Sequence, residues 1–205
     1  MVLILISLPF GSSDSVLMKS KVLQGWNLVS FTVIDALPTD YSDKYDLRIY
    51  FLDPIKKEYF GGTLDEFEDA FFQIIKEDGD PFLYGYWLYS NSDFEIDFRT
   101  LEDSEISHLK DYFDSLEAHL IEGWNLISIN DLMLEKSFLD VKGNCEFESV
   151  YHFERGQWFK QTESDLSEEF TLDSIGFSLA VKVDENCKLD YSENSGTSEV
   201  PSLPN

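Results

Sequence analysis

VLQGWNLVSF at positions 22–31 returns as LIEGWNLISI at positions 120–129. Gly, Trp, Asn and Leu are identical in the two stretches, and the next two residues are Val-Ser in one and Ile-Ser in the other. A match of this quality around a tryptophan indicates that the chain contains two copies of one structural unit. We therefore expect two similar halves, a first unit over 14–101 and a second unit over 118–191.

The Gly-Trp-Asn triplet is typical of a tight turn that leads into a strand. Glycine takes a positive φ without steric cost, and asparagine tolerates it while bonding to nearby backbone. We expect each tryptophan to fold back over the following strand and to be buried in the core, with its indole N–H bonded to a carbonyl. The alternative is a tryptophan platform for a sugar ring. The structural residues of the two turns are Gly25, Trp26, Asn27, Gly123, Trp124 and Asn125.

Weaker parallels extend the match between the halves. Aromatic strands joined by a polar turn occupy 48–60 and 149–159, which is a hairpin pattern. The closing segment 84–89, which contains Gly-Tyr-Trp, is aligned with 175–180. The predicted fold class is mainly β (α+β), with internally duplicated antiparallel β units and one or two short helices.

Helical spacing of apolar residues occurs in a few places. Thr63 and Glu66 form a capping-box pattern ahead of apolar residues at helical spacing, which predicts a helix over 63–77. A second pattern over 104–115 predicts a helix within a connecting segment, 102–117. The residues 164–169 predict at most a turn or two of helix.

The composition limits the partners. The chain has 205 residues, 43% of them hydrophobic and 15% aromatic, so it can bury a core. Its formal net charge is −25, and a surface this negative repels phosphate backbones and anionic lipid headgroups. Nucleic acid is therefore excluded as an expected partner, while cations, basic proteins and neutral glycans stay open. The acids also keep an aromatic-rich chain soluble.

The ends and the cysteines suggest export. The apolar start, 1–13, is either a signal remnant or a buried first strand, and the polar segment 192–205 is typical of a disordered tail. No segment has the length expected of a transmembrane helix. Cys145 and Cys187 form a disulfide if the protein is exported, or else are two buried free thiols.

The Gly-Trp-Asn-Leu-Val/Ile-Ser opening, the Tyr/Trp-rich hairpin and the Gly-Tyr-Trp-Leu-Tyr closing strand resemble a repeat of exported and cell-surface proteins of archaea and some bacteria. The resemblance covers about 19–191. The first half carries both ends of the pattern, whereas the second replaces the closing Gly-Tyr-Trp by Gly-Phe-Ser. It implies export and a surface context, and it brings no established activity and no catalytic residues.

No catalytic or metal-binding motif stands out. Gly176-Phe177-Ser178 has part of a nucleophile-elbow pattern, but the last glycine is missing, so a strand is the better interpretation. We expect surface or edge positions for the histidines, which are His108, His119 and His152. The acids of 140–148 depart from a calcium loop at the sixth position. We expect no catalytic residues, no metal site and no cofactor.

The leading hypothesis is a non-enzymatic extracellular or cell-surface module with a structural, adhesive or protein-binding role, with self-association open. One alternative is a carbohydrate-binding module that uses exposed aromatic platforms. The other is an enzyme with an acidic site that the sequence does not reveal. The candidate ligand-binding residues are Tyr84, Tyr86, Trp87, Tyr89 and Trp158.

Overall fold

β-Strands dominate the computed structural model, which describes residues 16–53, 55–67 and 83–191. Three antiparallel sheets are present in these residues, and the predicted fold class, mainly β with short helices, is confirmed. The elements are β1 (Leu17–Val22), β2 (Gly25–Ser30), α1 (Phe31–Asp35), α2 (Tyr41–Tyr45), β3 (Arg48–Leu52), β4 (Tyr59–Gly62), β5 (Gly85–Ser90), β6 (Phe94–Arg99), α4 (Asp103–Ser115), β7 (Gly123–Ser128), η2 (Asp131–Met133), β8 (Phe147–Glu154), β9 (Gln157–Lys160), α5 (Glu163–Leu166), η3 (Leu172–Ser174) and β10 (Ser178–Val183).

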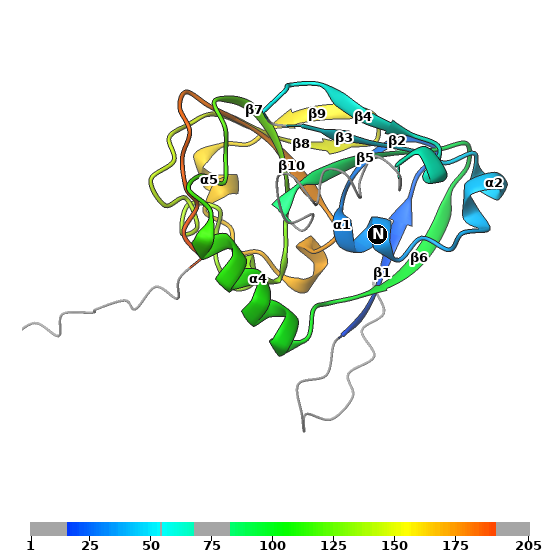
Figure 1. Cartoon of the computed structure of the whole chain (residues 1–205), viewed down its shortest axis with the longest axis horizontal. Helices are drawn as coiled ribbons and strands as arrows, with labels where there is room; N and C mark the ends of the chain where they lie inside the picture. The colour runs from blue at the N-terminus through cyan, green and yellow to red at the C-terminus, as the bar shows by residue number, and fades with distance from the viewer. Residues whose placement is uncertain (1–15, 54, 68–82, 192–205) are drawn as a thin grey trace, which may run out of the picture.

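Two of the sheets correspond strand for strand. The first sheet has the order β2-β5-β3-β4, and the second sheet has the order β7-β10-β8-β9. In both, the strand that begins with Gly-Trp-Asn pairs with the closing strand, which pairs with the central hairpin. Figure 1 shows the hairpins β3–β4 and β8–β9 at one side of the molecule and α4 at the other.

The register corrects the alignment of the closing strands by two residues. In the first sheet Ser30 pairs with Gly85, and in the second sheet Ser128 pairs with Ser178. Gly85 therefore corresponds to Ser178 and not, as the sequence suggested, to Gly176. Both segments contain a glycine followed by an aromatic residue, and this likeness suggested the wrong alignment. In the second half Gly176 and Phe177 come just before β10, so they lie outside the strand that pairs.

The two sheets are joined by reciprocal contacts. An isolated bridge links Val29 to Phe177, and a second bridge links Tyr84 to Ile127. In the register above, Val29 corresponds to Ile127 and Tyr84 to Phe177, so the two bridges are equivalent. The hydroxyl of buried Ser178 also donates to the carbonyl of Val29 at 2.8 Å. Two equivalent β-bridges thus join the first sheet to the second.

Three hydrophobic clusters follow from this arrangement. One lies between the first sheet and the β1–β6 ribbon, with Val33 of α1 fully buried in it. Another lies between the second sheet and α4, where Phe113 is fully buried. The third combines Leu28 and Leu126 at the contact between the two sheets. Each half therefore fills its own core, and the sheets share the third cluster.

The β1–β6 ribbon has a shortened counterpart in the second half. Val22 pairs with Phe94 at the end of the ribbon, and at the corresponding place Leu120 and Cys187 form a single bridge. Cys187 is bonded to Cys145. The disulfide alternative is therefore the one observed, and a covalent link stands where the first half has a second layer of strands.

The helices partly follow the sequence. α4 is the helix predicted over 104–115, and Thr63 and Glu66 make the predicted capping box, with Thr63 N–H donating to the Glu66 carboxylate at 2.9 Å. The predicted helix over 63–77 begins at position 64, and its part beyond 67 lies outside the described residues. The predictions for 1–13 and 192–205 also lie outside them. The sequence did not indicate α1 and α2, because each is only five residues long.

We expect Gly85→Ala to lower the free energy of unfolding by about 1–3 kcal/mol, because overpacking forces neighbours to shift. A Cβ at this position would lie 2.7 Å from the Cβ of Ser178. In the double variant with Ser178→Gly, the loss should be smaller than the sum of the two single losses. Urea unfolding of the four proteins measures this coupling, and additive losses would show that the two positions do not meet.

Replacing both Cys145 and Cys187 by alanine should destabilise the fold by about 4 kcal/mol, the chain-entropy value for a loop of this size. The two cysteines are separated by 42 residues. The comparison is made by urea unfolding of the oxidised protein and the variant. A loss well below 1 kcal/mol would contradict a structural role for the bond.

Candidate functional site

The two Gly-Trp-Asn turns have the same geometry. Gly25 has a φ of +94° and Gly123 a φ of +91°, a region that residues with a Cβ rarely adopt. The Asn27 side chain accepts from Leu23 N–H at 3.0 Å and donates to the Leu23 carbonyl at 2.8 Å. Asn125 makes the same two bonds to the backbone four residues before it, at 3.0 and 2.8 Å. The glycine and asparagine of each motif therefore act as predicted.

The tryptophans do not lie in the core, which corrects the sequence prediction. Trp26 is 44% exposed and Trp124 is 42% exposed. Side chains alternate between the faces of a strand, and the asparagine after each tryptophan turns to the opposite face to bond the preceding loop. The tryptophans therefore share a face with Leu28 and Leu126, at the open margin of the cluster between the sheets.

An open pocket of about 380 Å³ lies at this margin. We call it the aromatic pocket; it is lined by Trp26, Tyr50, Tyr59, Trp87 and Phe153. The first sheet contributes one ring from each of its four strands, and β8 of the second sheet contributes the fifth. The pocket therefore exists only where the two sheets meet.

Trp87 is the central wall of the aromatic pocket. Its ring lies nearly perpendicular to that of Trp26, with centroids 6.2 Å apart, and to that of Phe153, at 4.8 Å. Trp158, on β9, packs edge-on against it at 5.5 Å. The indole N–H of Trp87 donates to the Tyr59 hydroxyl at 3.4 Å. Edge-to-face packing of this kind fixes each ring in one orientation.

The five predicted ligand-binding residues fall on two faces. Trp87 lines the aromatic pocket, Trp158 packs on Trp87, and Tyr89 contacts Trp26 at 5.2 Å between centroids. Tyr84 and Tyr86 face the other way.

Tyr86 is fully buried, which corrects the expectation that it is exposed. It packs against Phe31, Phe51 and Phe67 in the cluster beneath the first sheet. Tyr84 packs against the same cluster and contacts Phe51 at 5.1 Å.

Sequence reasoning missed three lining residues, Tyr50, Tyr59 and Phe153, and raised Trp26 only as an alternative platform for a sugar ring. A signal was present, because alternation along β3 and β5 places Tyr50 and Trp87 directly opposite each other on one face of the sheet. What the sequence does not give is which of the two faces stays open.

The described part of the second sheet lacks the central ring of the aromatic pocket. The register places Ala180 where the first sheet has Trp87, so the central wall is missing. Lys57, in the turn between β3 and β4, also covers the second motif, because its Nζ donates to the Trp124 carbonyl at 3.2 Å. A Cβ added at Gly123 would lie 3.6 Å from that Nζ, whereas a Cβ at Gly25 would have no neighbour within 4 Å.

The other groups singled out in the sequence have structural roles. His119 is buried, not at the surface as predicted: it accepts from Leu189 N–H at 3.0 Å, and its Nε2 lies 2.8 Å from the Phe113 carbonyl. Burial lowers the pKa of His119. Ser178 begins strand β10, as the strand interpretation predicted. Within the described ranges, no three His, Cys, Asp or Glu side chains are grouped so that they could hold a metal ion.

Among the carboxylates that the structure describes, Asp131 stands out by its raised pKa. It is 8% exposed, and burial raises its pKa from 3.8 to about 6. One oxygen accepts from Leu101 N–H at 3.3 Å; the other is buried without a hydrogen-bond partner among the residues that the structure describes. Asp131 does not line the aromatic pocket, nor the second hollow of about 330 Å³ beside Arg99 and Glu105. Its partner Leu101 lines the second hollow, so Asp131 lies behind the wall of that hollow and away from the aromatic pocket.

The chain matches no known family model, no curated protein and no solved structure. Among the helices of the described part, none combines the length and the apolar character required to cross a bilayer. The functional interpretation therefore rests on the geometry of this chain.

Asp131 should make the protein less stable as the pH rises. Its pKa is raised in the folded state, so the folded state holds a proton that the unfolded state has lost, and stability falls between about pH 4 and pH 6. The total loss in the free energy of unfolding is about 3 kcal/mol. About 1.4 kcal/mol of this loss occurs between pH 5 and pH 8, a range that lies above the pI of about 4.2.

The Asp131→Asn variant separates this effect from the titration of the other acids. Its stability relative to the wild type should increase by about 1.4 kcal/mol from pH 5 to pH 8, as measured by urea unfolding. A difference that does not change with pH would mean that the folded-state pKa of Asp131 is ordinary.

Proposed function

We propose that this chain is a non-enzymatic binding module of the cell exterior, and that it holds a segment of a partner protein against the aromatic pocket. The observation that carries the proposal is the pocket itself, which five rings line where the two sheets meet, with Trp26 and Tyr59 the most exposed of them. Exposed apolar surface of this kind marks interaction sites. Tryptophan and tyrosine are also among the residues that contribute most to protein interfaces.

The pocket is rigid enough to bind without reordering. Trp26 and Trp87 stand on paired strands, β2 and β5, and Tyr50 stands opposite Trp87 on β3. The rings hold each other edge to face. A surface fixed in this way loses little side-chain entropy when a partner binds, so more of the contact energy appears as affinity.

Location at the cell exterior is supported by the disulfide. Cys145 and Cys187 are bonded, and such bonds persist mainly in secreted and surface proteins. The net charge of −25 also suits a protein that must stay soluble while it exposes aromatic rings.

A glycan is the competing ligand, because Trp26 and Trp158 are both partly exposed. Sugar sites combine a flat ring face with polar groups that bond the hydroxyls. The rings of the aromatic pocket stand edge-on to one another. The polar side-chain atoms of its lining are the indole N–H groups of Trp and the hydroxyl groups of Tyr. A side chain that inserts between the rings therefore fits it better than a sugar stacked on one of them.

Binding to arrays tests this proposal. The full chain is applied to an array of short peptides of systematically varied composition and to an array of glycans. We expect retained peptides, with affinity reduced at least about 10-fold by Trp26→Ala, the usual scale for a central aromatic contact. Trp158→Ala should weaken binding less, because Trp158 supports Trp87 from outside the pocket.

The chain offers two matched controls. Trp124→Ala removes the corresponding tryptophan of the second sheet, which is similarly exposed. Phe159→Ala removes a ring on the same strand as Trp158 that stacks on His152, on the other face. Both should bind peptides like the wild type. Retention of glycans alone would make the chain a carbohydrate-binding module, and binding to neither array would refute the proposal.

A further inference from the structure

We infer that the aromatic pocket takes a cationic side chain, that of a lysine or an arginine exposed on a basic partner protein. The inference rests on the proposed function and specifies the chemistry of its ligand. Two features carry it: the arrangement of the rings and the charge of the chain.

The rings form walls at steep angles to one another. Trp26 is inclined at 56° to Tyr50 and at 82° to Trp87, and Phe153 is inclined at 83° to Trp87. The face of an aromatic ring is electronegative, and it attracts a cation placed over it. A group that enters between such walls meets several faces, and tryptophan gives the strongest of these contacts. The five lining residues include no lysine, arginine or histidine that would repel it.

The net charge of the whole chain favours a cationic ligand. The chain has 40 acidic and 15 basic residues. Two basic side chains on or next to the strands of the pocket are paired with acids: Arg48 with Asp46 at 2.8 Å, and Arg155 with Glu154 at 3.5 Å. The remaining negative field raises the local concentration of basic partners and speeds their encounter. The same field opposes an anionic ligand.

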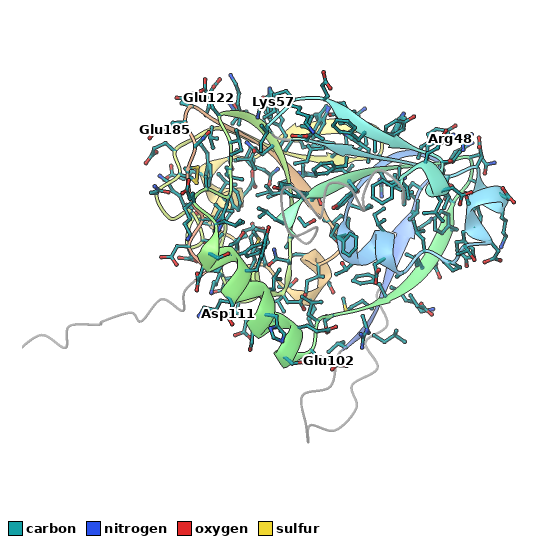
Figure 2. All side chains as sticks on the ribbon, in the orientation of Figure 1. Arg48, Lys57, Glu102, Asp111, Glu122 and Glu185 are labelled. Atoms are coloured by element: carbon teal, nitrogen blue, oxygen red, sulfur yellow. A yellow bond between two sulfur atoms is a disulfide. The ribbon has the colours of Figure 1, made fainter. Side chains whose placement is uncertain are left out.

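Lys57 contacts the backbone of the second Gly-Trp-Asn motif. Its ammonium group lies against Gly123 and donates to the Trp124 carbonyl at 3.2 Å. Figure 2 shows Lys57 beside Glu122. Partial burial lowers the pKa of Lys57, and the negative charge of Glu122 opposes this fall. The second motif is therefore occupied by a lysine of the chain.

The corresponding position at the first motif is open. A Cβ at Gly25 would meet no atom within 4 Å. The β8–β9 turn, which corresponds to the turn that carries Lys57, is also shorter: Glu154 and Gln157 are already paired, whereas six residues separate Leu52 from Tyr59 in the first sheet. The space beside Gly25 that corresponds to the place of Lys57 is therefore free of other side chains in the described part of the chain.

The test compares charged peptides with neutral peptides of the same shape. Blocked pentapeptides with a central arginine or lysine are titrated into the full chain at about 0.15 M salt, where exposed charges are screened beyond about 8 Å. The neutral partners carry citrulline or norleucine at the same place. The measured quantity is the preference ratio, defined as the Kd of the neutral peptide divided by the Kd of the charged peptide.

We expect the preference ratio to be about 2- to 30-fold higher for the wild type than for Trp26→Leu, the range of a cation–π contact. Trp124→Leu is the matched control and should keep the ratio of the wild type. Tyr59→Leu, at a ring that is more than half exposed, should lower the ratio without disturbing the core. Circular dichroism and thermal unfolding check that each variant is folded.

Each other outcome overturns the inference in its own way. If Trp26→Leu and Tyr59→Leu keep the ratio of the wild type, the preference comes from net charge alone. If neutral peptides bind as well as charged ones and both depend on Trp26, the pocket takes an apolar side chain and the proposed function stands. If no peptide binds, the proposed function fails together with the inference.

Discussion

The reciprocal joint between the two sheets is the constraint on which the rest of the molecule depends. Val29 bridges to Phe177, and the corresponding Ile127 bridges to Tyr84. Gly85 leaves room at this joint for its own counterpart, Ser178, whose hydroxyl bonds to the Val29 carbonyl. Because the hairpins β3–β4 and β8–β9 are anchored to these crossing strands, the joint sets how closely their ring-bearing faces approach. The aromatic pocket is a consequence of that approach.

The differences between the two halves, more than their likeness, give the protein its candidate site. Both motifs place a tryptophan at the surface by the same means, a glycine with positive φ and an asparagine bonded to the loop. Only Trp26 then meets a central ring, Trp87, since the second sheet has Ala180 at that place. Lys57 covers the other motif. Two sheets of the same strand order thus differ at their surfaces, and the aromatic pocket lies at the first motif.

The sequence predicted the elements well, because their signals are local. The Gly-Trp-Asn triplets, the aromatic hairpins and the capping box at Thr63 each act over a few residues. The direction in which Trp26 points could not be predicted, because alternation gives only which residues share a face, and the second sheet decides which face is covered. The burial of His119 depends in the same way on distant residues such as Leu189. The correct alignment of Gly85 with Ser178 also depends on the strand register, which only the pairing of the strands shows.

The four tryptophans of the chain allow a direct test of the claim that recognition is confined to the first motif. The full chain is labelled with 5-fluorotryptophan, its four ¹⁹F resonances are assigned with single Trp→Phe variants, and a blocked arginine pentapeptide is added. We expect the resonances of Trp26 and Trp87 to shift with peptide concentration while that of Trp124 stays in place. Equal shifts at Trp26 and Trp124, or a shift at Trp124 alone, would contradict it.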